Sequence, residues 1–243
     1  MRSQSRVLLL ACLALLAAGP AAADPLLLTI QPIQICNDGG SACANAGREL
    51  FEEVGNEIWT QADIWFDFLG WVTVFETDLL DTTFAFLTSP NHGQNENELV
   101  INLWFVNTIT DCGGSAFPYG CGYVDGNGVA IANSVFAANR IDTIAHELGH
   151  NLGLEHTTDA LNLEASGAYR LVPGSIDDVY PRGGKRDQLY DWQIAIARSS
   201  GFLTAYSTPD TGVPVPEPAS LTLVLTGAAI VALHTARARR RRR

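Results

Sequence analysis

Residues 146–156 read HELGHNLGLEH, and they hold three of the five histidines in a chain of 243 residues. The spacing is H-E-x-x-H-x-x-G-x-x-H. With so few histidines, we expect this pattern by chance in roughly one such chain in 100,000. The shorter H-E-x-x-H recurs by accident on ordinary helices, but the extended form points to a site.

The residues before the second histidine predict a helix. Asn139 is a candidate N-cap, and Asp142 would favour the positive end of the helix. Apolar residues recur at helical spacing and predict one buried stripe: Ile141, Ile144, Ala145, Leu148 and Leu152. At about 100° per residue, His146 and His150 project roughly 140–180° from that stripe. The two histidines are therefore not expected to be core residues.

The spacing fits a catalytic zinc site. Imidazoles at i and i+4 can bind one ion at about 2.0–2.1 Å, and a turn at Gly153 would bring His156 to it as a third ligand. Three protein ligands leave a fourth position for water. Glu147 is then placed to act as general base on that water. The expected reaction is hydrolysis of a peptide bond.

With this motif the sequence resembles the metzincin clan of zinc metallopeptidases. The resemblance implies that His146, His150 and His156 are the zinc ligands and Glu147 the catalytic base. It also implies an α+β fold, with a twisted, mostly parallel sheet, an active-site helix and a C-terminal helix. In the clan an edge strand pairs with substrate, and Glu98–Val106 is the candidate, although a central strand has nearly equal support. Tyr169 is a weaker candidate for an extra ligand or oxyanion donor.

The rest of the pattern agrees with this order of elements. Residues 47–62 and 186–203 predict helices, and "DGNG" at 125–128 predicts a hairpin turn rather than a calcium loop. Strand-like stretches occupy residues 63–75, 84–89, 98–106 and 128–136.

The N-terminus predicts export. Residues 1–23 have arginines, an apolar run and small residues before the expected cleavage site, which is typical of a secretory signal peptide. A membrane anchor is the alternative, although the apolar run is short. We therefore expect a catalytic domain over residues 24–208, followed by a Pro-rich linker over 209–218.

The C-terminal segment, residues 219–243, follows a Pro-Glu-Pro triplet and joins a short apolar run to an arginine cluster. It resembles the PEP-CTERM sorting signal of Gram-negative bacteria. That resemblance implies processing by an exosortase-type membrane protease, with transient anchoring in the inner membrane before display at the cell surface or release. A permanent C-terminal anchor is the alternative.

Charge and cysteines fit an exported protein. Residues 24–218 keep seven basic and all 26 acidic residues, a net charge of about −19 that disfavours nucleic-acid binding. Three disulfide pairings of the remaining four cysteines are possible, and the short loops favour Cys36–Cys43 and Cys112–Cys121. A four-cysteine zinc site is the alternative.

One position departs from the metzincin pattern. The clan has a methionine in a turn below the zinc, but the only methionine here is Met1, and "NLEAS" places Glu164 at the corresponding point. A bare buried carboxylate costs several kcal/mol. We therefore expect Glu164 to point to solvent, with a hydrogen bond to a ligand imidazole as the alternative.

The sequence thus predicts an exported, monomeric zinc endopeptidase acting on proteins or peptides. The competing hypothesis is a zinc-binding surface or matrix protein with a metzincin-like fold and little or no peptidase activity. Glu147 favours the enzyme, because a site without turnover has no need of a base there.

Overall fold

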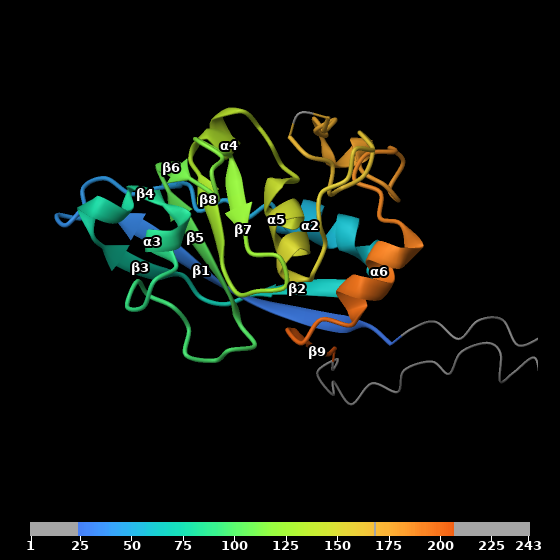
Figure 1. Ribbon diagram of the computed structural model, residues 1–243, viewed down its shortest axis with the longest axis horizontal. Helices are drawn as coiled ribbons and strands as arrows, with labels where there is room; N and C mark the ends of the chain where they lie inside the picture. The colour runs from blue at the N-terminus through green and yellow to red at the C-terminus, as the bar shows by residue number, and fades with distance from the viewer. Residues whose placement is uncertain (1–23, 168, 207–243) are drawn as a thin grey trace, which may run out of the picture. The chain divides into compact units, whose positions relative to one another are not determined.

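A long strand, β1 (Leu26–Cys36), forms the centre of the main sheet (Figure 1). The computed structural model describes residues 24–167 and 169–206. Three isoleucines of β1 are fully buried: Ile30, Ile33 and Ile35. β1 carries strands on both of its edges, and its nearly continuous apolar content is typical of a central strand of a parallel sheet.

The sheet has the order β2-β1-β5-β8-β7, with β3 and β9 also paired to β1. All of these pairings are parallel except those of β7 with β8 and of β9 with β1. β4 and β6 form a separate two-stranded parallel sheet. The remaining strands are β2 (Ile64–Phe68), β3 (Val72–Phe75), β4 (Asp81–Thr83), β5 (Ile101–Val106), β6 (Thr108–Asp111), β7 (Gly120–Gly122), β8 (Val129–Ala132) and β9 (Leu203–Ala205).

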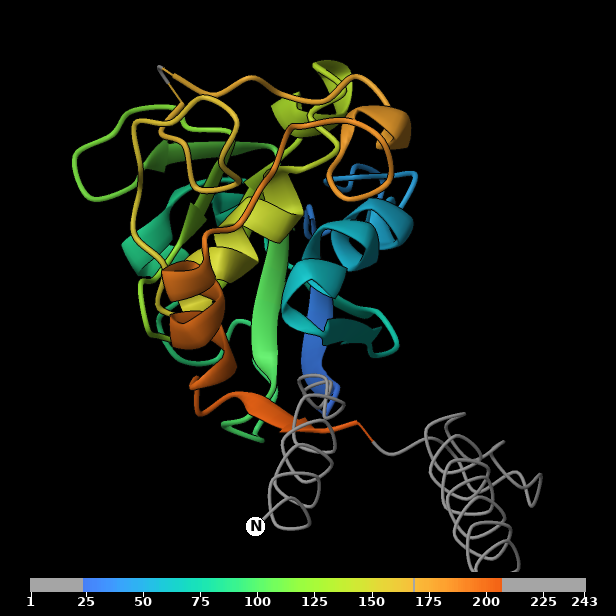
Figure 2. The same cartoon turned by 90° about the vertical axis from the view of Figure 1, so that its right-hand side faces the viewer.

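Two helices, α2 (Glu52–Trp59) and α5 (Thr143–Asn151), lie side by side on one face of the sheet (Figure 2). Trp59 is fully buried between them, and its indole N–H donates to the backbone oxygen of Ala145 at 3.2 Å. The other helices are α3 (Phe84–Leu87), α4 (Ser134–Ala137), α6 (Asp191–Arg198) and the 3-10 turns Thr60–Ala62, Thr77–Leu79 and Ile176–Asp178.

The predicted fold class is confirmed. The described chain is a mixture of α and β, with a mostly parallel sheet, a helix that carries the histidine motif and a final helix, α6. The favoured disulfides are also present: Cys36–Cys43 and Cys112–Cys121. The "DGNG" turn joins β7 to β8 in an antiparallel hairpin, as predicted.

Two predictions about strands are corrected, and two strands were not predicted at all. The stretch 84–89 is not a strand but contains α3, because the Thr83 side chain caps it by accepting from the Phe86 N–H at 3.2 Å. β5, within the stretch 98–106, lies between β1 and β8 and is buried throughout, so it is not the edge strand. The edge strand beside α5 is β7. The sequence predicted neither β7 nor β1.

The predicted signal peptide (1–23), linker (209–218) and sorting segment (219–243) lie outside the described residues, and those boundaries stay predictions. Within the part that the structure describes, no helix combines the length and apolar character needed to cross a membrane.

Candidate zinc centre

The helix that carries the motif begins later than predicted. Its N-cap is Asp142, not Asn139, which instead adopts a left-handed backbone conformation with φ 51°. The apolar stripe is confirmed, since Ile141, Ile144, Ala145, Leu148 and Leu152 are all buried. The stripe packs on the sheet and on α2, so the opposite side of α5 is free to carry the histidines.

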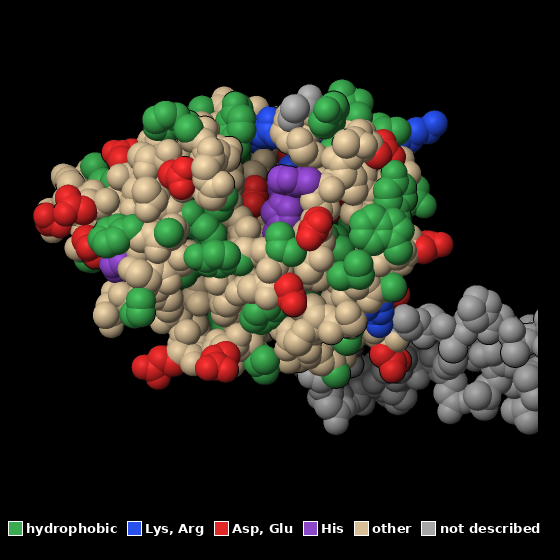
Figure 3. All heavy atoms as spheres, viewed as in Figure 1, with side chains coloured by type: hydrophobic (Ala, Val, Ile, Leu, Met, Phe, Trp, Pro, Cys, Tyr) green, Lys and Arg blue, Asp and Glu red, His purple; other side chains and the backbone are tan. Residues whose placement is uncertain are grey.

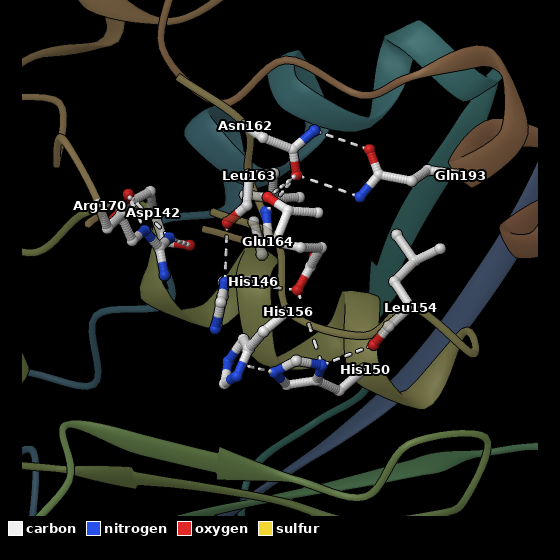
Figure 4. A network of polar contacts seen from close by, with 12 residues as sticks. Asp142, His146, His150, Leu154, His156, Asn162, Leu163, Glu164, Arg170 and Gln193 are labelled. Atoms are coloured by element: carbon white, nitrogen blue, oxygen red, sulfur yellow. Dashed lines mark hydrogen bonds and ion pairs between the residues drawn. The ribbon is translucent and has the colours of Figure 1, made fainter. Parts of the chain in front are cut away.

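The structure brings the three predicted ligands together. One nitrogen each of His146, His150 and His156 lies within 4.8 Å of the others. The Nε2 atoms of His150 and His156 are 3.1 Å apart. Two of the imidazoles come from successive turns of α5 and the third from the segment after it (Figure 4).

Backbone carbonyls fix the two helical imidazoles. His146 Nδ1 donates to the Leu163 oxygen and His150 Nδ1 to the Leu154 oxygen, each at 2.7 Å. With the proton on Nδ1, each Nε2 keeps a lone pair for a metal. Burial lowers the pKa of His150 to about 4 and that of His146 well below its usual value, so both rings are neutral at neutral pH.

This donor set fits zinc. Three neutral imidazoles at metal–nitrogen distances of about 2.0–2.1 Å have nitrogens roughly 3.3 Å apart in a tetrahedron, close to the 3.1 Å between His150 and His156. Three protein ligands leave one position open, as in catalytic zinc sites. The second nitrogens of His146 and His150 already have acceptors, which is the usual outer support of such ligands.

Glu147 lies beside the histidine cluster and against β7, in which two of the three residues are glycine. A Cβ on Gly120 would come 2.5 Å from Glu147 Oε1, and one on Gly122 would come 2.7 Å from the Glu147 backbone oxygen. β7 can therefore approach α5 this closely only because it has glycine at both positions. Glu147 is buried, and this burial raises the pKa of its carboxyl to about 8.

The histidines and Glu147 line one cleft of about 620 Å³. In Figure 3 the purple imidazoles lie in a hollow of the surface, with acidic and basic side chains beside them. One wall of the cleft contains Cys112, Tyr119 and Cys121, and the other contains residues of α5 and of the segment after it. The disulfide thus holds the wall that faces the histidines.

The end of α5 is shaped by two residues of the motif. Gly153 has φ 91°, as the sequence predicted for the turn that leads to His156. Asn151, fully buried, donates its amide to three carbonyls of the β7–β8 hairpin: Tyr123, Gly126 and Gly128 at 3.1, 2.7 and 3.1 Å. This contact joins the edge strand to the zinc helix, and the sequence reasoning missed it.

The expectation for Glu164 is wrong. Its side chain is fully buried beneath the imidazoles, with Oε2 3.4 Å from His146 Nδ1 and 3.6 Å from His150 Nδ1 (Figure 4). Neither carboxyl oxygen has a hydrogen-bond partner among the described residues. The space for it comes from Gly149, where any Cβ would collide with Glu164 Oε1. Burial raises the pKa of this carboxyl well above its usual value.

The turn that holds Glu164 is anchored to the last helix. The side chains of Asn162 and Gln193 exchange two hydrogen bonds, at 2.7 and 3.1 Å, and both are buried. Asn162 Oδ1 also accepts the Glu164 N–H at 2.9 Å. The turn therefore cannot rotate Glu164 outward without breaking a buried pair of amides, which the sequence alone does not reveal.

Tyr169, considered as a further ligand, is 56% exposed and belongs to neither the histidine cluster nor the described lining of the cleft. In its place, two arginines line the cleft, Arg140 and Arg170. Neither was among the predicted site residues, since no motif marks them.

Comparison with known proteins points the same way. Residues 75–157 match the metallo-peptidase family M12B, reprolysin-like, which is about a third of the chain and includes the histidine motif. No curated protein sequence matches.

Among solved structures, the chain is similar to one in a chaperone–substrate complex, with 14% identity, TM-score 0.42 and coverage of 72% of this chain and 34% of that one. For mature mirolysin of Tannerella forsythia, in complex with a cleaved peptide, the identity is 15% and the TM-score 0.48, with coverage of 73% of this chain and 92% of that one. For metalloproteinase-II of Bacteroides fragilis the identity is 14% and the TM-score 0.45, with coverage of 74% of this chain and 54% of that one. The chain thus spans about a third of the first of these chains and about half of the third.

The sheet, the motif helix, the matched segment and the three imidazoles agree with one another. The described domain has a metzincin-like zinc-metallopeptidase fold, and its three-histidine cluster is a zinc site.

Proposed function

We propose that the protein is a zinc-dependent endopeptidase that cleaves proteins or peptides. The observation that carries this proposal is the position of Glu147, whose buried carboxyl lines the same cleft as the three imidazoles. A site that only held a metal for structure would be closed by a fourth protein ligand and would need no carboxyl there.

The residues supply a complete hydrolytic arrangement. The imidazoles of His146, His150 and His156 hold the metal, which when bound polarises the scissile carbonyl and lowers the pKa of water. Glu147 accepts a proton from the attacking water and delivers it to the leaving amine. Its burial raises the pKa of the carboxyl, which favours uptake of the proton that it then passes on.

The edge strand β7 is the natural place for the substrate backbone. Among the residues that the structure describes, it pairs with β8 alone, and it lies against α5. An extended peptide added to this edge would pass over the histidine cluster, and main-chain hydrogen bonds would hold it there. The cleft is open at the surface rather than closed, which suits a segment within a longer chain (Figure 3).

A test uses the zinc-loaded protein and a peptide library read by mass spectrometry. We expect cleavage at internal peptide bonds, abolished by a chelator and by Glu147→Gln. Glu52→Gln, which neutralises an exposed glutamate of α2, is the matched control and should leave cleavage unchanged. Zinc binding without cleavage of any peptide would contradict the proposal and favour the zinc-binding surface or matrix protein.

We also propose that the protein is exported, processed at its C-terminus by an exosortase-type protease and displayed or released. Two disulfides support an oxidising compartment. The intact mass of the protein at the cell surface tests this proposal, and we expect residues 1–23 and the arginine cluster to be absent. A surface form that retains the arginines would favour a permanent anchor.

A further inference from the structure

Arg140 is an unpaired cation in the zinc cleft. It lies between α4 and α5 and lines the cleft together with Glu147 and Tyr119. Its guanidinium stacks over the Tyr119 ring, 4.4 Å from the centroid. Its Nε is buried and has no hydrogen-bond partner, and Arg140 forms no ion pair with any residue in 24–167 or 169–206.

The second arginine of the cleft shows the contrast. Arg170 Nη2 and Nε contact Asp142 Oδ2 at 2.8 and 3.0 Å, so its charge is already matched. Asp142 is thereby also taken, and Glu147 is packed beneath Gly120 of β7. Arg140 is left as the cation in the cleft without an anion of its own.

The environment of Arg140 favours an incoming anion. Partial burial, and next the nearby charge of Arg170, lower the pKa of the guanidinium, while Asp142 and Glu147 act in the opposite direction. The group stays a cation at neutral pH, and an anion that joined it would relieve the cost of its burial. Stacking on Tyr119 fixes the plane of the Arg140 guanidinium and leaves the N–H groups at its edge free to donate hydrogen bonds. Thr143, one turn before Glu147, also lines the cleft and has a hydroxyl without a partner among the described residues.

We propose that Arg140 determines substrate specificity by binding the carboxylate of an acidic side chain in the peptide. That residue flanks the scissile bond, on the side of the cleft where Glu147 and Tyr119 lie. A guanidinium binds a carboxylate through two parallel hydrogen bonds, which an amide of the same shape cannot match. This inference rests on the proposed peptidase function and names its substrate class.

The net charge of the protein narrows the class of preferred substrates further. The chain outside its two predicted signals is strongly acidic, so it repels peptides with many acidic residues. That repulsion between exposed charges is screened beyond about 8–10 Å at physiological salt, whereas contact with Arg140 is local. The preferred substrate therefore has one Asp or Glu beside the cleaved bond in an otherwise neutral or basic segment.

The test compares pairs of peptides that differ only by Glu or Gln, with the pair placed in turn at each position within three residues of the scissile bond. For the zinc-loaded protein we expect kcat/KM to be about 10- to 100-fold higher for Glu at one position. Arg140→Gln should bring the ratio of kcat/KM for the Glu peptide to kcat/KM for the Gln peptide close to one, whatever its effect on the absolute rates. Arg182→Gln removes the same charge at an exposed site and should keep the preference.

A second readout separates this inference from the peptidase proposal. Binding of the same peptides to zinc-loaded Glu147→Gln protein is measured by calorimetry, where a preference for Glu that Arg140→Gln abolishes supports the inference even if no peptide is ever cleaved. Equal handling of Glu and Gln at every position by the wild-type protein would overturn it. An equal loss of cleavage of both peptides in Arg140→Gln would also overturn it, by giving Arg140 a general rather than a selective role.

Discussion

Two buried carboxyls contact the zinc helix, and their surroundings differ. Asp142, at the start of α5, is held by Arg170 through two contacts to one oxygen and a further bond from Arg170 to its backbone oxygen at 3.2 Å. Glu164, beneath the imidazoles, has no partner for either oxygen among the described residues. Both side chains are fully buried.

The difference distinguishes a buried carboxylate that is stabilised by an ion-pair partner from a buried carboxyl group that has none. A buried pair is costly to break, because the surviving charge loses its partner without regaining water. A lone buried carboxyl is costly to keep, and the raised pKa of Glu164 shows that burial favours its neutral form. We therefore expect substitutions at the two places to change the free energy of unfolding in opposite directions.

The largest effect is expected from breaking the paired carboxyl. Arg170→Met should lower the free energy of unfolding by about 3–5 kcal/mol, because Asp142 is left buried and unpaired at the N-terminus of α5. Urea denaturation of the zinc-free protein measures this loss. Arg182→Met removes an exposed arginine with ion pairs to Glu53 and Asp177, and it should cost less than about 1 kcal/mol. Similar losses in the two variants would remove the distinction drawn here.

Glu164→Met tests the lone carboxyl. We expect a gain of about 2 kcal/mol in the free energy of unfolding of the zinc-free protein, since an apolar side chain of similar length pays no desolvation cost. Zinc should still bind, because His146 and His150 keep their backbone acceptors. Denaturation in chelator and a zinc titration measure the two quantities.

The matched control is Glu155→Met, which changes an exposed glutamate of the same region and should alter stability by less than about 0.5 kcal/mol. A loss of stability in Glu164→Met, or zinc affinity more than about tenfold weaker, would show that Glu164 instead supports the imidazoles.

The pH dependence of stability sharpens the comparison through Asp187. Burial, and next the adjacent Asp142 carboxylate, raise the pKa of Asp187 to about 8. The folded protein then holds a proton that the unfolded chain loses near pH 4, so this contribution to stability is complete below pH 4 and falls as pH rises towards 8. The slope is about 1.4 kcal/mol per pH unit in the middle of that window.

Asp187→Asn should remove this part of the slope. The difference between wild-type and variant denaturation curves from pH 5 to pH 8 measures the contribution of Asp187 together with its effect on the neighbouring carboxyls of Asp142 and Glu164. Identical slopes would mean that Asp187 is already ionised in the folded state.

The smallest effect concerns the space for Glu164. Gly149→Ala should destabilise the wild-type protein, because the new Cβ meets Glu164 Oε1. In a Glu164→Ala background the same change should be neutral or stabilising, since alanine favours helix by up to about 1 kcal/mol over glycine. A double-mutant cycle should give a coupling of about 1 kcal/mol. Additive effects would place the constraint on Gly149 elsewhere, for example at Trp59, whose ring would lie 3.3 Å from the Cβ.

Much of the site could be predicted because its geometry is local. Histidines four residues apart on one helix, a stripe of apolar residues on its other side and a glycine at the turn fix the directions of three side chains within eleven residues. The disulfides were predictable for the same reason, since each closes a short loop. The fold class followed from the resemblance that this motif carries.

The positions of the strands needed the tertiary structure. A continuous apolar run such as β5 is compatible with an edge or a centre, and its place depends on which strands pair on either side. β7 has three residues, two of them glycine, and carries no strand signal, yet it forms the wall of the cleft because glycine allows its close approach to Glu147.

The sequence by itself determined a zinc helix, the three candidate ligands and the candidate base, because these depend on spacing along one element. Only the tertiary structure decided where Glu164 and Arg140 lie. Glu164 is buried because Gly149 leaves it room and because Asn162 and Gln193, 31 residues apart, hold its turn. Arg140 lines the cleft without an ion-pair partner among the described residues, while Arg170, from a distant segment, pairs with the carboxylate of Asp142. Such competition for partners is set by distances in space, which residue spacing does not encode.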